Sequence, residues 1–194
     1  MSDDALLQGL RRGDEKAFSI LVETYQPPML RLALAFVPDR STAEDVVQET
    51  WMGVIRGIGR FEGRSSLKTW IFHILVNQAR KRAIREHRTV ALNDLGGVEE
   101  ERFAPDGTWT TPPSPWPDDV ADRLFASDVV KKLHTTMAQL PATQRQVVTL
   151  RDVEGLSPRD VCELLDITEA NQRVLLHRAR EKLRRTVELE MGGR

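Results

Sequence analysis

The sequence predicts an all-α protein with two helical domains joined by an extended acidic linker that contains proline and tryptophan. Apolar residues recur at steps of three and four in the first ninety residues and again after residue 123, as expected of amphipathic helices. The stretch between them is rich in proline, glycine and acidic residues, which favours an extended chain. We therefore expect domains at residues 1–90 and 123–190 and a flexible linker at residues 91–122.

The net charge of −1 hides three strongly charged segments. Residues 73–88 contain five basic residues and one acidic residue, a net charge of +4. Residues 93–128 contain nine acidic residues and two arginines, a net charge of −7. Residues 168–185 contain six basic and two acidic residues, again a net charge of +4. Two basic helices on either side of an acidic connector predict two surfaces that bind phosphate groups.

Several functional classes are not expected. The N-terminus lacks the basic start and apolar centre of a signal peptide, and no apolar run reaches the roughly 18 residues of a membrane span, so we expect a cytoplasmic protein without membrane insertion. The single cysteine, Cys162, excludes an intrachain disulfide. The sequence contains no phosphate-binding glycine loop, Ser-His-Asp signature or HExxH motif. We therefore expect no enzyme, no catalytic residue, no cofactor and no metal site.

In the first domain, Pro27 and Pro28 are expected to break a helix and leave a short second helix over residues 29–36. Ser41, with Glu44 three residues later, has the pattern of a capping box that starts the next helix. The apolar stripe of that helix consists of Val47, Trp51, Val54 and Ile58, and its opposite face of Asp45, Gln48, Glu49, Met52 and Arg56. The stripe predicts core, whereas the opposite face is expected to contact solvent unless a partner covers it.

A short polar loop at residues 61–66 precedes the most basic helix of this domain. Ser65 or Ser66 can cap that helix, which is expected to run from Leu67 to about residue 87. One of its faces carries Leu67, Ile71, Ile74 and Gln78, and another carries His73, Asn77, Arg80, Lys81 and Ile84. The second face presents amide and basic groups on one side of the helix.

The linker contains two of the four tryptophans, Trp109 and Trp116, which predict a docking contact or a fold-back onto one of the domains. Beyond the linker, we expect a helix that Pro141 stops and another over residues 142–152 that Gly155 ends. The apolar face of the first of these helices consists of Leu124, Val129, Leu133, Met137 and Leu140.

Residues 157–185 have the pattern of a helix-turn-helix. Ser157 is a cap and Pro158 suits the first position of a short helix, while Thr168 can cap a longer basic helix. The longer helix buries Leu176, Ala179 and Leu183, and its outward arc consists of Asn171, Val174, His177, Arg178 and Arg185, with Arg173 at the edge. Such a helix fits a DNA major groove about 12 Å wide. A helical hairpin that only packs would show the same periodicity.

The order of these parts resembles the extracytoplasmic-function (ECF) family of RNA polymerase sigma factors. Residues 43–51, AEDVVQETW, resemble the polymerase-binding helix of that family. Residues 60–71, RFEGRSSLKTWI, and residues 77–81, NQARK, resemble its −10 recognition region. Residues 140–148, LPATQRQVV, and residues 177–184, HRAREKLR, resemble its −35 recognition region.

The resemblance implies a sigma factor that binds core RNA polymerase and directs promoter-specific transcription initiation. Core polymerase would be bound by Asp45, Gln48, Glu49 and Met52. The −10 element and its melted non-template strand would be bound by Phe61, Glu62, Gly63, Arg64, Ser65, Ser66, Trp70, Asn77, Arg80 and Lys81. The −35 element would be bound by Asn171, Arg173, Val174, His177 and Arg178. The implied partners are core RNA polymerase, promoter DNA and an anti-sigma factor.

The recognition helix departs from the family pattern. A valine-lysine-serine-arginine run is common there, whereas this chain has Gln172-Arg173-Val174-Leu175, so Leu175 replaces the usual phosphate-facing arginine. The alternatives are a dimeric helix-turn-helix regulator without sigma activity and a protein-binding adaptor. A regulator would bind its DNA site alone, whereas a sigma factor should bind weakly until polymerase is added.

Overall fold

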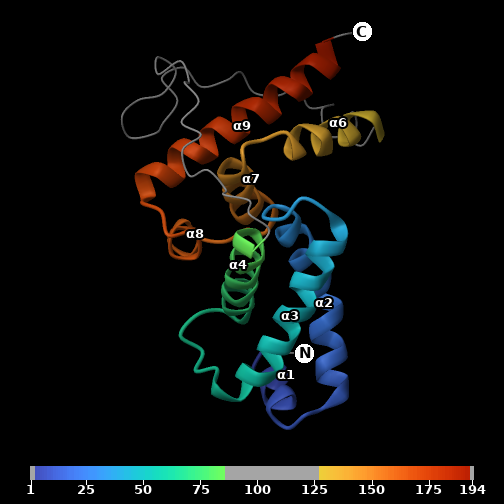
Figure 1. Cartoon of the computed structure of the whole chain (residues 1–194), viewed down its shortest axis with the longest axis vertical. Helices are drawn as coiled ribbons and strands as arrows, with labels where there is room; N and C mark the ends of the chain where they lie inside the picture. The colour runs from blue at the N-terminus through green and yellow to red at the C-terminus, as the bar shows by residue number, and fades with distance from the viewer. Residues whose placement is uncertain (1–2, 86–126, 193–194) are drawn as a thin grey trace. The chain divides into compact units, whose positions relative to one another are not determined.

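The computed structural model describes residues 3–85 and 127–192, which belong to two separate units (Figure 1). Neither described range contains a β-strand, so the prediction of an all-α chain with two helical domains is confirmed for these residues. The expected linker at residues 91–122 and the expected helical position of Leu124 lie outside the described residues.

The first unit is a helical bundle with α3 at its centre. Its elements are α1 (Asp3–Arg11), α2 (Glu15–Leu34), α3 (Arg40–Gly57), the 3-10 helix η1 (Ile58–Arg60) and α4 (Leu67–Arg85). Helix α3 packs against α2 and α4, and α2 and α3 lie side by side in Figure 1. The stripe predicted for α3 is confirmed, because Val47, Trp51, Val54 and Ile58 are 9% exposed or less.

Helix α2 continues through Pro27 and Pro28, so the predicted break between two helices is wrong. Each proline removes a backbone hydrogen bond and costs about 3 kcal/mol inside a helix. Leu21 and Met29, on either side of the pair, are both fully buried in the same core. Burial of one large apolar side chain contributes about 1.5–3 kcal/mol, so tertiary packing on both sides offsets the effect of the prolines.

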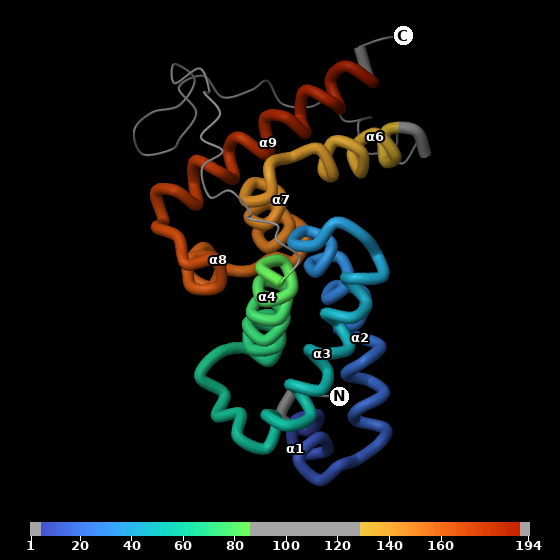
Figure 2. Tube along the Cα trace, in the orientation of Figure 1, coloured from blue at the N-terminus to red at the C-terminus, as the bar shows by residue number. Residues whose placement is uncertain are grey.

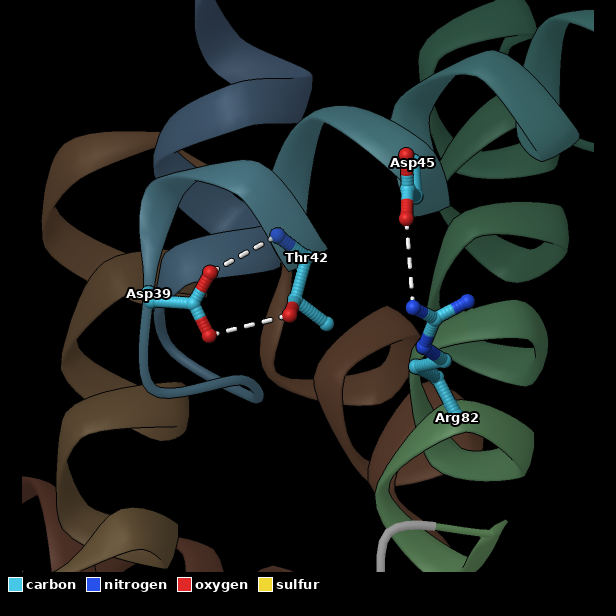
Figure 3. A network of polar contacts seen from close by, with 4 residues as sticks. All are labelled: Asp39, Thr42, Asp45 and Arg82. Carbon is cyan, nitrogen blue, oxygen red and sulfur yellow. Dashed lines mark hydrogen bonds and ion pairs between the residues drawn. The ribbon is translucent and has the colours of Figure 1, made fainter.

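Helix α3 begins at Arg40, one residue before the predicted cap, and the capping box at Ser41 is therefore wrong. Asp39 is the N-cap, and its carboxylate accepts hydrogen bonds from the Thr42 backbone N–H and the Thr42 hydroxyl, both at 2.9 Å (Figure 3). Glu44 instead forms an exposed ion pair with Arg40 at 2.7 Å. The Asp39 carboxylate accepts from a helix N–H that has no partner within the helix. Its negative charge also interacts favourably with the positive end of the helix dipole, and both effects explain why an aspartate caps this helix.

Helix α4 begins where it was predicted, but its buried face is broader than the predicted stripe. Its buried residues are Leu67, Thr69, Ile71, Phe72, Leu75, Val76, Ala79 and Ala83. Of the four residues that the sequence places on one face, Leu67 and Ile71 are buried and Ile74 and Gln78 are half-buried, while the buried Phe72 was not singled out. The difference arises because α4 packs against both α2 and α3, which a single stripe cannot do.

The second unit surrounds one long helix. Its elements are α6 (Ser127–Ala138), α7 (Ala142–Val148), the π-helical turn η3 (Thr149–Val153), α8 (Pro158–Leu165) and α9 (Glu169–Gly192). Helices α6, α7 and α8 all pack on α9, and Figure 2 traces α9 beside α6 and α7. A single helix was predicted over residues 142–152. The structure has an α-helix that ends at Val148 and then the wider π-helical turn η3, and Gly155 follows with a φ of +69°.

The helix-turn-helix pattern is confirmed in its local details. Ser157 caps α8 by accepting a hydrogen bond from the Asp160 N–H at 3.1 Å, and Pro158 occupies the first helical position. Asp166 turns the chain with a φ of 56°, a left-handed conformation that aspartate tolerates. Thr168 then caps α9 through the Asn171 N–H at 3.2 Å.

The capping assignment predicts different effects for two neighbouring substitutions. Asp39→Ala should lower the free energy of unfolding by about 1 kcal/mol, because it removes the acceptor of the Thr42 N–H and hydroxyl. Ser41→Ala is the control and should change it by less than about 0.5 kcal/mol. Urea unfolding followed by circular dichroism measures both values, and a larger loss for Ser41→Ala would restore the capping box.

Candidate functional site

The outer face of α3 combines exposed polar groups with exposed apolar surface. Gln48 and Glu49 are exposed, and Met52 is 50% exposed. Ile55, which the sequence analysis did not single out, is 51% exposed one turn further on. Side chains at steps of three and four lie on one side of a helix, so these residues form one surface. Large apolar side chains on such a surface are typical of a protein-binding site.

Asp45, the first residue assigned to this face, has a partner within the protein. Its carboxylate forms an ion pair with the Arg82 guanidinium of α4 at 3.1 Å (Figure 3). Both side chains are partly exposed, at 49% for Asp45 and 30% for Arg82. The pair therefore connects the outer face of α3 to the basic end of α4, and it stabilises the fold only modestly because solvent screens it.

The loop at residues 61–66 has a buried aromatic start and an exposed polar middle. Phe61 is only 6% exposed, and its ring lies 5.1 Å from the ring of Trp70. Trp70 in turn lies so close to Gly57 that a Cβ there would be 2.9 Å from the indole. The residues on the surface of the loop are Glu62, Gly63, Arg64, Ser65 and Ser66. Phe61 and Trp70 thus form an aromatic base beneath a polar surface.

The polar part of the loop is ordered by short-range contacts. Glu62 accepts a hydrogen bond from Arg64 at 2.7 Å, and Gly63 between them has a φ of +74°, which favours glycine. Ser66 ends the loop as the cap of α4, accepting from the Thr69 N–H at 3.0 Å. The choice between Ser65 and Ser66 as the cap is therefore decided for Ser66.

The basic residues near the end of α4 lie on its outer side. Asn77 and Lys81 are exposed one turn apart, while Arg80 is half-buried. Ile84, on the same side, is 74% exposed. Amide, ammonium and guanidinium groups on one helical face suit hydrogen bonds to a nucleic-acid backbone.

The outward arc of α9 is only partly exposed. Asn171 and Arg173 are exposed and Val174 is 43% exposed, whereas His177 and Arg178 are half-buried. The Nε and Nη1 atoms of Arg178 are buried without a hydrogen-bond acceptor among the described residues. Leu175 is 5% exposed and faces the core, so this position presents no group to a ligand.

A pocket of about 430 Å³ next to this arc was not predicted from the sequence. It is lined by Arg151, Ser157, Pro158, Arg159, Glu169, Gln172, Arg173 and Leu176. Three arginines and one glutamate give these residues a net charge of +2. The start of α8 contributes the positive end of its helix dipole, so the pocket has the character of an anion site.

Two hydrogen-bond donors at this pocket have no acceptor among the residues that the structure describes. Gln172 is 2% exposed and its Nε2 is unsatisfied, as is the buried Nε of Arg151. Arg151 also donates from Nη1 to the Leu156 carbonyl oxygen. Gln172 could have been noticed in the sequence, because it lies at helical spacing before the buried residues Leu176 and Ala179.

Other arginines of α9 are occupied within the second unit. Arg180 forms a bidentate ion pair with Asp152, with N···O distances of 2.6 and 2.8 Å, and hydrogen bonding to this carboxylate raises the pKa of Arg180. Arg185 pairs with Glu181 at 3.2 Å. At the pocket itself, Arg173 pairs with Glu169 at 3.4 Å and Arg159 pairs with Glu163 at 3.0 Å, both in exposed pairs that solvent screens.

Among the described helices, none is long and apolar enough to cross a membrane.

Two family models match the chain, one in each unit. Sigma-70 region 2 matches residues 21–89, and Sigma-70, region 4, matches residues 131–183. The chain is 33% identical over 181 residues to the RNA polymerase sigma-H factor of Pseudomonas aeruginosa, covering 93% of this chain and 91% of that protein. It is 29% identical over 184 residues to the ECF RNA polymerase sigma-E factor of Escherichia coli, covering 94% and 93%.

Solved structures with the same fold include a complex of the sigma factor RpoE with the anti-sigma factor NepR from Bartonella quintana. That sigma factor matches with a TM-score of 0.58 and 25% identity, over 90% of this chain and 98% of its own. CnrH, solved with the cytosolic domain of CnrY, matches with a TM-score of 0.57 over 96% and 97%, and at 19% identity it indicates the fold alone.

Proposed function

The chain belongs to the extracytoplasmic-function (ECF) family of RNA polymerase sigma factors, and we propose that it uses separate surfaces for core polymerase, the −10 element and the −35 element. As a sigma factor it directs promoter-specific transcription initiation. The observation that carries this function is the order of regions 2 and 4 along one chain that is 33% identical to a sigma factor over 93% of its length. A dimeric regulator would need only the second unit.

Core polymerase binds the outer face of α3 in this proposal. Gln48 and Glu49 supply polar contacts, and Met52 supplies an apolar anchor that is already half-exposed. Asp45 takes part while it is paired with Arg82, so it presents one carboxylate edge to the polymerase. Ile55 extends the apolar part of the same surface, and an apolar centre with a polar rim is usual for such interfaces.

The loop at residues 61–66 captures an unpaired base of the −10 element. Its exposed residues, Glu62 to Ser66, offer acceptors and donors for a base edge, and the Phe61–Trp70 pair supports them from below. Asn77, Arg80 and Lys81 hold the adjacent backbone. Removing a base from the stack costs a few kcal/mol, and capture in a polar loop with phosphate contacts offsets that cost. Core polymerase then performs the phosphoryl transfer.

The start of α9 binds the −35 element in the major groove. Asn171, Arg173 and Val174 are the exposed residues of the arc and contact base edges, with His177 and Arg178 further along the helix. The pocket beside the arc accepts a backbone phosphate, because three arginines line it and the start of α8 adds the positive end of a helix dipole.

Regulation and location follow from this function. Because the similar solved structures are complexes, one of them with a named anti-sigma factor, we propose that an anti-sigma factor also controls this chain. The protein works in the cytoplasm, where core polymerase and promoter DNA are found.

The function is tested by transcription with purified core polymerase on a genomic promoter library. Addition of the chain should create a set of defined start sites, and Met52→Arg should lower core affinity about tenfold or more, because it places a charge in an apolar contact. Ile20→Arg is the matched control, since Ile20 is 40% exposed on α2. Unchanged start sites would refute the function, and equal affinities for the two variants would refute the assigned surface.

Substitution of Gln172 separates stability from DNA binding. Gln172→Val should raise the free energy of unfolding by about 1 kcal/mol, because it removes a buried donor without an acceptor. Because the Gln172 amide is buried, the same change should leave holoenzyme binding to −35 duplexes within about twofold, whereas Arg173→Ala, which removes an exposed guanidinium, should weaken it about three- to tenfold. A valine variant that loses DNA affinity as strongly as Arg173→Ala would contradict this separation.

Lys81 is expected to contact a phosphate rather than a base. Lys81→Ala should weaken holoenzyme binding on all promoters alike and should make the slope of log affinity against log salt concentration shallower by about one. Binding titrations at several salt concentrations on two unrelated promoters measure this effect. A loss confined to one promoter would assign Lys81 to a base instead.

A further inference from the structure

Hydrogen bonds fix the first and last residues of the loop at residues 61–66, whereas the residues between them are exposed. At its end, the Ser66 carbonyl oxygen accepts from the Trp70 N–H at 3.0 Å, in addition to the side-chain cap. Residues 62–65 are exposed, and the side-chain contacts found for them, such as Glu62 with Arg64, stay within the loop. The conformation of this short span therefore depends on how firmly its two ends are fixed.

The start of the loop is fixed by a residue from a different helix. Arg11, the last residue of α1, donates from Nη2 to the Phe61 carbonyl oxygen at 2.6 Å across a separation of 50 residues. The Phe61 N–H donates to the Ile58 carbonyl oxygen at 3.2 Å, so both backbone polar groups of Phe61 are bonded. A hydrogen bond from a guanidinium is charge-assisted, shorter and about twice as strong as a neutral one.

We propose that Arg11 is a positioning residue for the −10 recognition loop, which sets the direction in which the loop leaves Phe61. The inference rests on the proposed function of residues 61–66 in capturing a base. Capture of a flipped base requires groups placed to within about 0.5 Å, and a loop that must be ordered on binding loses affinity. The Arg11–Phe61 bond removes that freedom before DNA arrives.

The geometry separates this role from a contribution to core packing. The Arg11 side chain is exposed, while α1 is anchored by the buried residues Leu6 and Leu10, each 8% exposed. The Phe61 ring packs on Trp70, a contact in which the Arg11 guanidinium takes no part. Loss of the Arg11 guanidinium should therefore release the loop and leave the bundle folded.

Three variants test the proposal in the complete holoenzyme. Arg11→Met removes the donor and keeps an unbranched apolar stem, and Arg11→Lys keeps a charged donor. Arg12→Met, at the next position, which is also exposed, is the matched control. Each variant is assayed for thermal unfolding, for affinity for core polymerase, and for open-complex formation on a promoter used by the unaltered protein and its single-base variants across the −10 element.

Arg11→Met should slow open-complex formation about tenfold, as expected for loss of a charged hydrogen bond, and should reduce the preference among bases at one −10 position. Unfolding and core affinity should stay unchanged, Arg11→Lys should recover part of the preference, and Arg12→Met should behave as the unaltered protein. If Arg11→Met matches Arg12→Met, or loses stability with its base preference intact, the positioning role is wrong. Failure of the unaltered holoenzyme to initiate would instead refute the proposed function.

Discussion

Burial of the apolar stripe of α3 between α2 and α4 is the interaction from which the other surfaces of the first unit follow. Val47, Trp51 and Val54 face the core, so the helical period turns Gln48, Glu49 and Met52 outward. The same packing places α4 against α3 and so brings Arg82 within 3.1 Å of Asp45. The face proposed for polymerase and the helix proposed for DNA are therefore two sides of one packed core, and neither can be reoriented without disturbing it.

Charge in the second unit is divided between internal pairing and an outward-facing part. Arg180 and Arg185 of α9 are paired with Asp152 and Glu181, and exposed pairs of this kind contribute about 0–1 kcal/mol. The Arg180–Asp152 pair joins α9 to η3, whereas the Arg185–Glu181 pair lies within α9 and neutralises one of its later turns. Arg173 and Arg159 at the pocket have exposed partners within their own helices, Glu169 and Glu163, with which a phosphate bound at the pocket would compete. A count of charges along the sequence could not make this distinction.

What could be predicted from the sequence depends on the range of the interaction. The cap at Ser157 and the stripe of α3 arise from contacts within one or two turns, and both were predicted correctly. The continuity of α2 through Pro27 depends on burial on both sides of the proline pair, which local propensity does not include. The Asp45–Arg82 and Arg11–Phe61 contacts join residues 37 and 50 positions apart, so only the fold reveals them.

Unsatisfied donors beside the recognition arc suggest why this unit is not built for maximum stability. Gln172, Arg151 and Arg178 each bury a donor nitrogen without an acceptor among the described residues, and each such group costs about 1–3 kcal/mol. An apolar residue at position 172, on the buried side of α9, would remove that penalty. The buried carboxamide lies between Asn171 and Arg173, two exposed residues proposed to contact DNA, so the stability of α9 and the placement of its DNA contacts are set by the same turn. Stability below the attainable maximum beneath a functional surface is usual in natural proteins, because selection acts on activity once the fold is stable enough.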